Sequence, residues 1–261
     1  SLLSRALFWG LLPVVAAQGL YVRRIAPRFA PADGDPFGTE GAGLPGPGLS
    51  LLALGDSIVA GVGAGRMEQA FAAATARALS VGAAGPVRWL AVGRSGADAR
   101  EVSDELMPRA VACAADIPPI DAVIVSVGVN DLTGLRRSGQ WARDLSRVLD
   151  QCRQACPEAA VALSGLPPMQ DFPLLPQPLR RLMGLRARRF TEVAAEVVAA
   201  RPGMVLVPLA FDPAVDAFAD DGFHPGPASY ARLGAAMAAA LKPRLREGRG
   251  SLRCRDNARR P

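Results

Sequence analysis

Five short apolar runs, separated by segments with helical periodicity, constrain the fold of this chain more than any other feature. The runs are "LSLLALG" at 49–55, "VRWLAVG" at 87–93, "DAVIVSVG" at 121–128, "AAVALSGLPP" at 159–168 and "GMVLVPLA" at 203–210. Strands that are apolar throughout are typical of a parallel sheet covered on both faces, and parallel strands need right-handed helical crossovers. The sequence therefore predicts a doubly wound α/β fold, with a parallel sheet of about five strands and helices on both faces.

The flanking segments differ in composition from the domain predicted over residues 49–245. Residues 29–48 are dense in Gly and Pro and have little apolar content, which predicts a linker. Residues 246–261 are basic and polar and lack aromatic side chains, which predicts a disordered tail.

The amino-terminal part, residues 1–28, contains an uncharged apolar segment at 6–22, followed at once by Arg23 and Arg24. Its seventeen residues would span about 25 Å as a helix, slightly less than a hydrocarbon core of about 30 Å. A membrane anchor, a signal peptide cut near Ala16 or Ala17, and a helix packed on the domain all remain open. The arginines favour an uncleaved anchor with the domain on the cytoplasmic side, and export after cleavage is the alternative.

The charge pattern argues against a nucleic-acid partner although the formal net charge is +6 and the pI is about 9.9. Lys242 is the only lysine, and the arginines outside the tail are interleaved with acidic residues. No aromatic and basic interleaving or zinc-finger spacing is present. Cys152 and Cys156 fall on the apolar stripe of one predicted helix, so the four cysteines indicate neither a metal site nor a disulfide framework.

Residues suited to acyl-transfer chemistry follow the apolar runs, where the ligand crevice of an open parallel sheet forms. Ser57 follows the first run, and a serine hydroxyl needs a neighbouring base to act as a nucleophile. His224 is the only histidine, so any Ser-His mechanism must use it. Asp221, three residues earlier, is positioned to orient the imidazole, with Asp220 as the alternative.

A tetrahedral oxyanion also needs hydrogen-bond donors. Asn130 offers a side-chain amide at the end of the third run, and Gly96 offers a backbone N–H that reactants can approach closely. The backbone N–H of Ser57 is the third candidate donor for an oxyanion hole.

These segments resemble the SGNH or GDSL hydrolases. Gly55-Asp56-Ser57 resembles the first family block, Gly96 in "GRSGADA" the second, "GVND" at 128–131 the third and "DGFHP" at 221–225 the fifth. The blocks occur in family order over most of the domain, and position 58 is Ile where many members have Leu. The resemblance implies that Ser57 is the nucleophile, His224 the base and Asp221 its orienting acid. It implies that Ser57, Gly96 and Asn130 supply the oxyanion donors.

The expected function is therefore a serine esterase that acts on a small-molecule or lipid ester through an acyl-enzyme, without a metal or cofactor. The loop at 166–178 is expected to shape the substrate pocket, and no oligomeric state is predicted. A non-catalytic lipid- or carbohydrate-binding module on the same fold is the alternative. The glycines at 61–65 are spaced GxGxG rather than GxGxxG, which argues against dinucleotide binding.

Overall fold

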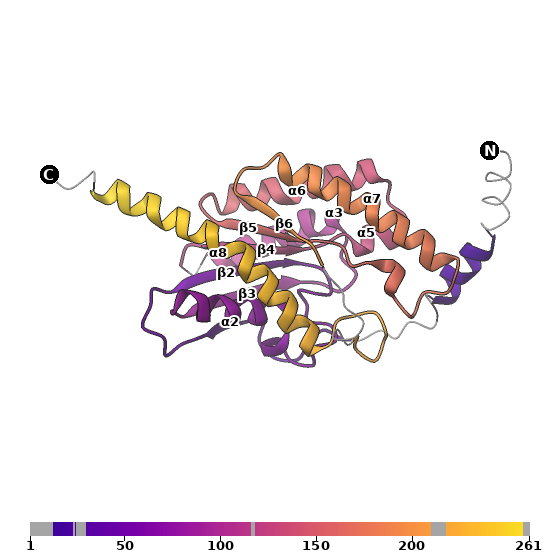
Figure 1. Ribbon diagram of the computed structural model, residues 1–261, viewed down its shortest axis with the longest axis horizontal. Coiled ribbons are helices and arrows are strands. Elements are labelled where there is room, and N and C mark those ends of the chain that lie inside the picture. The colour runs from indigo at the N-terminus through magenta and orange to yellow at the C-terminus, as the bar shows by residue number, and fades with distance from the viewer. Residues whose placement is uncertain (1–12, 23, 25–29, 116–117, 210–217, 258–261) are drawn as a thin grey trace.

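The computed structural model describes residues 13–22, 24, 30–115, 118–209 and 218–257, with side chains described through Leu245 (Figure 1). Its centre is a six-stranded sheet in the order β1-β3-β2-β4-β5-β6. The strands are β1 (Phe37–Glu40), β2 (Leu49–Gly55), β3 (Val87–Gly93), β4 (Ala122–Ser126), β5 (Ala160–Ser164) and β6 (Met204–Val207). All neighbouring pairs from β3 across to β6 are parallel, which confirms the five strands and the α/β fold expected from the sequence.

Strand β1 is a difference from the expectation, because it lies inside the segment interpreted as a linker. It pairs antiparallel with β3 at the edge of the sheet. Gly38 lies against the Trp89 ring, where a Cβ atom would come within 2.8 Å of the ring, and Glu40 forms an ion pair of 2.8 Å with Arg77. A four-residue edge strand with alternating exposure carries little apolar signal, so its composition resembles that of a loop.

Helices alternate with the parallel strands along the chain. They are η1 (Met67–Gln69), α2 (Phe71–Ala83), α3 (Ala99–Glu101), η2 (Val102–Leu106), α4 (Met107–Ala114), α5 (Val129–Thr133), α6 (Ser138–Ala155), η3 (Met169–Asp171), α7 (Leu179–Ala199) and α8 (Pro227–Asn257). Helix α8 extends to Asn257 and so runs into the segment for which the sequence predicts a disordered tail. Polar and arginine-rich composition does not exclude a helix, because Arg has a high helix propensity.

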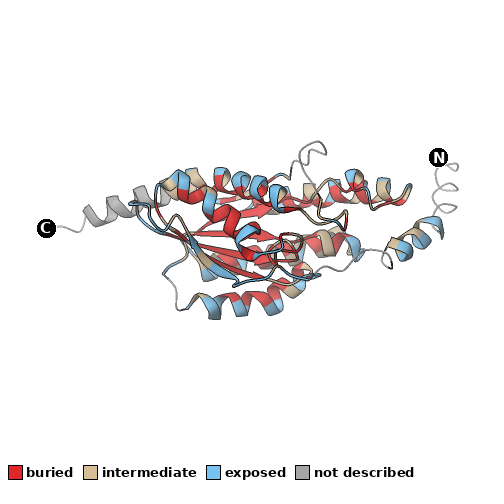
Figure 2. Ribbon diagram, turned by 90° about the horizontal axis from the view of Figure 1, so that it is seen from below, coloured by how far each residue is buried: buried red, intermediate tan, exposed pale blue. Residues whose placement is uncertain are grey.

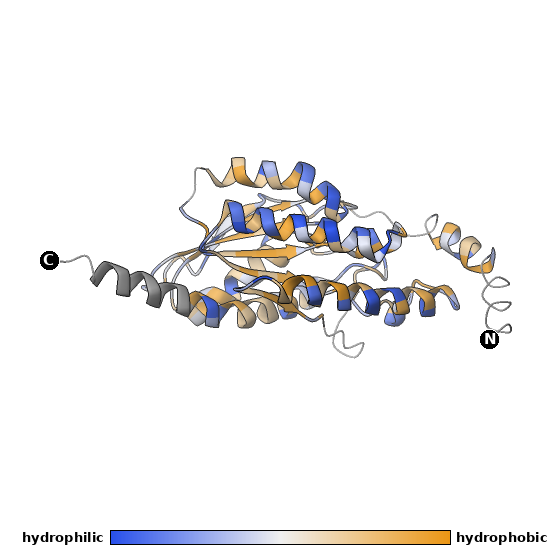
Figure 3. Cartoon of the chain, turned by 90° about the horizontal axis from the view of Figure 1, so that it is seen from above, coloured by the Kyte–Doolittle hydropathy of each residue, from blue (hydrophilic) through white to orange (hydrophobic). Residues whose placement is uncertain are grey.

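Two hydrophobic clusters lie on opposite faces of the sheet, in accord with the alternation of side chains along each strand (Figure 2). Leu52 and Leu54 of β2 face the cluster formed with α4, α6 and α7. Leu51 and Ala53 face the cluster formed with α2 and α8. The strands are predominantly hydrophobic, whereas the covering helices alternate between hydrophobic and hydrophilic faces (Figure 3). The sheet is thus buried on both sides, and its strand ends remain available for a site.

The described part of the amino-terminal segment, residues 13–22, is a helix beside the start of α7. The Gln18 side chain donates to the Gln177 carbonyl at 2.6 Å and accepts from the Leu179 N–H at 3.1 Å. Val15 and Val22 pack against the core. Within the described ranges, no helix has both the length and the apolar content needed to cross a bilayer. Residues 6–12 of the segment interpreted as an anchor lie outside the described residues.

Candidate active site

Ser57 lies where β2 ends, at the crevice between neighbouring strands. In the parallel pairing, Gly55 is opposite Gly93 of β3 and Ser126 of β4. Strand order reverses at β2, because β3 lies on one side of it and β4 on the other, and such switch points form ligand crevices. Gly55 has φ +153°, and a Cβ atom there would lie 1.9 Å from the Ser126 carbonyl oxygen. The glycine therefore permits the close strand approach from which the chain turns to present Ser57.

His224 is held next to Ser57 by a short loop before α8. The Ala219 N–H donates to the His224 carbonyl at 2.8 Å, and the Gly222 N–H donates to the Ala219 carbonyl at 2.9 Å. Gly222 has φ +62°, a conformation that glycine adopts without strain. His224 Nε2 lies 3.0 Å from Ser57 Oγ, although 167 positions separate the two residues.

Asp221, and not Asp220, is the carboxylate beside the imidazole. Its Oδ2 lies 2.6 Å from His224 Nδ1, and the side chain is buried. Its Oδ1 accepts the backbone N–H groups of Phe223 and His224 at 2.8 and 2.9 Å. Asp220 is exposed. The structure thus brings together Ser57, His224 and Asp221, and it places Asp221 rather than Asp220 beside the imidazole.

The glycine-rich stretch after β2 packs against this histidine loop. Gly63 has φ +89°, and a Cβ atom there would lie 2.5 Å from the Pro225 carbonyl oxygen. The buried Tyr230 hydroxyl donates to the Val62 carbonyl at 2.7 Å. Gly63 therefore allows the His224 loop to approach the stretch that follows Ser57.

The other two candidate oxyanion donors lie on segments that follow β3 and β4. Gly96 has φ +84°, and no atom lies within 4 Å of the position that its Cβ would occupy. Asn130, at the start of α5, donates one side-chain N–H to the Ala97 carbonyl at 2.9 Å. An amide NH2 carries two hydrogens, so one remains for a substrate oxygen.

Asp56 is a buried carboxyl group adjacent to Ser57 that the sequence interpretation left without a role. Desolvation raises its pKa to about 7, although hydrogen bonds from the Ile58 N–H and the Ser126 hydroxyl oppose the shift. These two donors reach Asp56 Oδ1 at 3.1 and 3.2 Å. Asp56 therefore links the serine turn to the end of β4.

A cleft of about 220 Å³ opens beside Ser57 and His224. Its wall is mainly apolar and includes Val127, Val129, Pro167, Phe172, Leu209, Phe218, Phe223 and Leu233. The Phe172 ring packs edge-on against Phe218 and Phe223, with ring centroids 5.1 and 5.2 Å apart. Pro167 and Phe172 belong to the loop expected to shape the pocket, and they do line this cleft.

At the carboxyl edge of the parallel sheet, a serine hydroxyl, an imidazole and a buried carboxylate form one hydrogen-bonded row. This is the geometry of a serine hydrolase. The chain belongs to the GDSL-like lipase/acylhydrolase family, whose model matches residues 53–232.

Known proteins agree with this assignment in sequence and in fold. The GDSL-like esterase Rv1075c of Mycobacterium tuberculosis is 28% identical over 258 residues, which cover 92% of this chain and 79% of that protein. The family 3 carbohydrate esterase of Clostridium thermocellum superposes with a TM-score of 0.59 at 17% identity, covering 77% of this chain and 98% of that one. TesA superposes with a TM-score of 0.58 at 24% identity, covering 75% of this chain and 99% of that one. Carbohydrate acetylesterase Est24 of Sinorhizobium meliloti has a TM-score of 0.56 at 18% identity, covering 75% of this chain and 99% of that one.

Asp56 and Asp131 belong to two of the motifs singled out in the sequence, but the sequence predicted no role for either residue. Both are buried, and burial raises the pKa of Asp131 to about 6. For Asp56 the signal that could have found it is a charged residue placed directly after a buried strand, whereas Asp131 lies in α5 beyond the end of β4 and carries no such signal. Their contacts could not be deduced, because they depend on how separate loops pack.

Proposed function

We propose that this protein is a serine esterase that hydrolyses carboxylic esters through an acyl-enzyme. The observation that carries the proposal is the row of contacts beside the end of β2, with 3.0 Å between Ser57 Oγ and His224 Nε2 and 2.6 Å between His224 Nδ1 and Asp221 Oδ2. These distances lie within hydrogen-bond reach, which is the geometric requirement for a nucleophile and its base.

In the first half-reaction, His224 Nε2 accepts the proton of Ser57 Oγ while Oγ forms a bond to the ester carbonyl carbon. The carbonyl electron pair moves to the oxygen, and the N–H groups of Ser57 and Gly96 and the Asn130 amide stabilise the negative charge. The imidazolium then gives its proton to the alcohol oxygen as the carbon–oxygen bond breaks. Asp221 stabilises the imidazolium and holds the tautomer that leaves Nε2 free to act as the base.

In the second half-reaction, water replaces the alcohol. His224 accepts a proton from the water, whose oxygen attacks the acyl carbon, and the same donors stabilise the second oxyanion. Return of the proton from His224 to Ser57 Oγ releases the acid and restores the starting state. The proposed cycle uses no metal or cofactor.

The proposed substrates are esters with a short or medium apolar acyl group. The apolar cleft beside Ser57 supports this choice, and its volume of about 220 Å³ has room for roughly seven water-sized groups. Carbohydrate esters are the second candidate class, since the names of two superposed proteins include carbohydrate esterase and carbohydrate acetylesterase.

We further propose that the protein associates with a membrane through residues 6–22, with the domain on the cytoplasmic side. The uncharged apolar sequence and the arginines that follow it support this proposal. The contacts between Gln18 and the start of α7 would hold this segment close to the domain.

Hydrolysis of p-nitrophenyl acetate, butyrate and hexanoate by the wild-type protein and by Ser57→Ala tests the proposed function. We expect wild-type turnover, with kcat/KM rising about fourfold for each methylene that enters the cleft, because each buried methylene contributes about 0.8 kcal/mol. Ser57→Ala is expected to have no turnover above background. A non-catalytic binding module would hydrolyse none of these esters, and equal rates in the two proteins would contradict the proposed nucleophile.

A further inference from the structure

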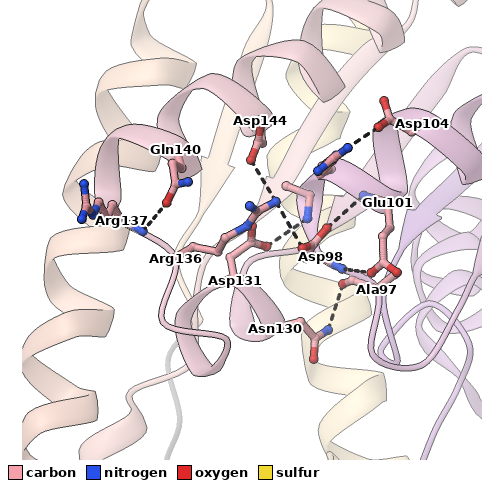
Figure 4. A network of polar contacts seen from close by, with 12 residues as sticks. Ala97, Asp98, Glu101, Asp104, Asn130, Asp131, Arg136, Arg137, Gln140 and Asp144 are labelled. Atoms are coloured by element: carbon pink, nitrogen blue, oxygen red, sulfur yellow. Dashed lines mark hydrogen bonds and ion pairs between the residues drawn. The ribbon is translucent and has the colours of Figure 1, made fainter.

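The three residues after Gly96 are held at both ends by two adjacent side chains of α5 (Figure 4). The Asn130 amide donates to the Ala97 carbonyl at 2.9 Å. The Ala99 N–H donates to Asp131 Oδ2 at 3.0 Å. One oxyanion candidate, Asn130, and its neighbour Asp131 are therefore bonded to the segment that carries another candidate, Gly96.

The segment turns at Gly96, which is the residue in it with the fewest conformational restraints. Gly96 has a positive φ and no neighbouring atom within 4 Å of its Cβ position. Within the turn, the Ala97 N–H donates to the Arg94 carbonyl at 3.1 Å, and the Asp98 N–H donates to Glu101 Oε2 at 3.0 Å. A glycine in such a turn has wide conformational freedom, so the direction of its N–H depends on the residues that hold the flanking chain.

Burying the Asp131 carboxylate at this position costs folding free energy. Its side chain has 0% exposure, and among the described residues its Oδ1 has no hydrogen-bond partner. Desolvation, the main cause, raises its pKa to about 6, while the bond from the Ala99 N–H acts in the opposite direction. A buried carboxylate with one unpaired oxygen destabilises the fold, so a role in stability alone does not account for it.

The charged groups around Asp131 come from several elements and tie the same segment in place. Arg136, after α5, bridges Asp98 at 3.3 Å and Asp144 of α6 at 3.4 Å. Asp98 also caps α3, where its side chain accepts from the Glu101 N–H at 2.9 Å. The Asp98 charge raises the pKa of Asp131 and the Arg136 charge lowers it, while the Asp131 charge in turn raises the pKa of Asp56.

Arg186 of α7 reaches the chain next to this network as well. Its guanidinium donates to the Arg136 carbonyl at 2.9 Å and to the Leu132 carbonyl at 3.4 Å. The end of α5 is thus fixed from α7 while its start is bonded to the Gly96 segment. Because Arg186 fixes the end of α5, the helix cannot shift to compensate for a change at Asp131. Loss of the Asp131 side chain would therefore release the Ala99 N–H and the residues after Gly96.

We propose that Asp131 is a positioning residue for ester hydrolysis, whose buried carboxylate fixes the Ala99 N–H and so keeps the Gly96 N–H and the Asn130 amide aimed at the same substrate oxygen. The role rests on the proposed function and adds to it a residue that does not itself touch the substrate. A hydrogen bond to a charged acceptor is about twice as strong as a neutral one. The ionised form of Asp131 therefore holds the segment more firmly than the protonated form.

The test compares Asp131→Asn and Asp131→Ala with the wild-type protein, using p-nitrophenyl acetate between about pH 5 and pH 8. Asp131→Ala is expected to lower kcat about 100-fold at about pH 8 with little change in KM, the effect of misaligned oxyanion donors. Asp131→Asn, which keeps an acceptor oxygen but no charge, is expected to lower kcat about tenfold. Asp150→Asn is the matched control, because it makes the same chemical change on α6 at a carboxylate that pairs with Arg201, outside the network around residues 96–99, and its kcat should be unchanged.

The pH dependence separates positioning from a structural role. Below about pH 6 the wild-type carboxyl becomes neutral, so the ratio of wild-type to Asp131→Asn kcat should approach one. Removing a buried charge should also leave Asp131→Asn at least as resistant to thermal unfolding as the wild type at about pH 8.

Three results would overturn the role of Asp131 while wild-type hydrolysis persists. They are an unchanged kcat in Asp131→Ala, a loss in Asp131→Asn that is the same at every pH, and a loss that tracks a lower melting temperature. Absence of wild-type hydrolysis would instead overturn the proposed function, and the positioning role with it.

Discussion

His224→Ala is expected to lower kcat for p-nitrophenyl acetate about 10⁶-fold, because it removes the base for both half-reactions. His224 is the only histidine of the chain, and its Nε2 lies 3.0 Å from Ser57 Oγ. Without a base, the serine hydroxyl is a weak nucleophile at neutral pH. Steady-state kinetics measures the loss, and circular dichroism of the same preparation checks that the fold is retained.

A His224→Ala protein that is folded and keeps more than about a hundredth of wild-type kcat would contradict this account, since loss of a catalytic base costs far more than that. His224→Gln provides a second variant that keeps the size and polarity of the side chain. It is expected to be as inactive as His224→Ala, because an amide is not a base at this pH.

Asp221→Asn is expected to lower kcat about 10⁴-fold, the loss seen when the orienting carboxylate of such a row becomes an amide. The carboxylate lies 2.6 Å from His224 Nδ1, where an amide NH2 would favour the tautomer that carries its proton on Nε2. That tautomer cannot accept the proton of Ser57. KM should change much less than kcat, because Asp221 does not face the substrate.

Asp220→Asn is the matched control for this prediction. It makes the same chemical change one residue earlier in the chain, at an exposed side chain. We expect its kcat to equal that of the wild type. Equal losses in the two variants, or a larger loss in Asp220→Asn, would contradict the assignment of Asp221.

The parallel strands could be predicted because each is predominantly apolar and ends in a turn. All seven residues of β2 and all five residues of β4 are buried. Strand β1 could not be predicted, because an edge strand of alternating exposure need not be apolar. The extension of α8 to Asn257 was missed because charge composition was given more weight than helix propensity.

The candidate site was predictable where motifs lie at strand ends, since topology brings those ends together. This applies to Ser57 and Asn130, whereas His224 lies in the loop before α8 and was singled out because it is the only histidine. The contact between Asp131 and the Ala99 N–H was not predictable, because it joins two loops whose approach depends on the packing around them. The same holds for Gln18, whose amide bonds to residues about 160 positions away.

Labelling with a fluorophosphonate followed by peptide mapping tests most directly whether Ser57 is an activated nucleophile. We expect the wild-type protein to carry one phosphonyl group on Ser57 and Ser57→Ala to carry none, with His224→Ala labelled far more slowly. An unlabelled wild-type protein, or a label on another residue that persists in Ser57→Ala, would contradict the central claim.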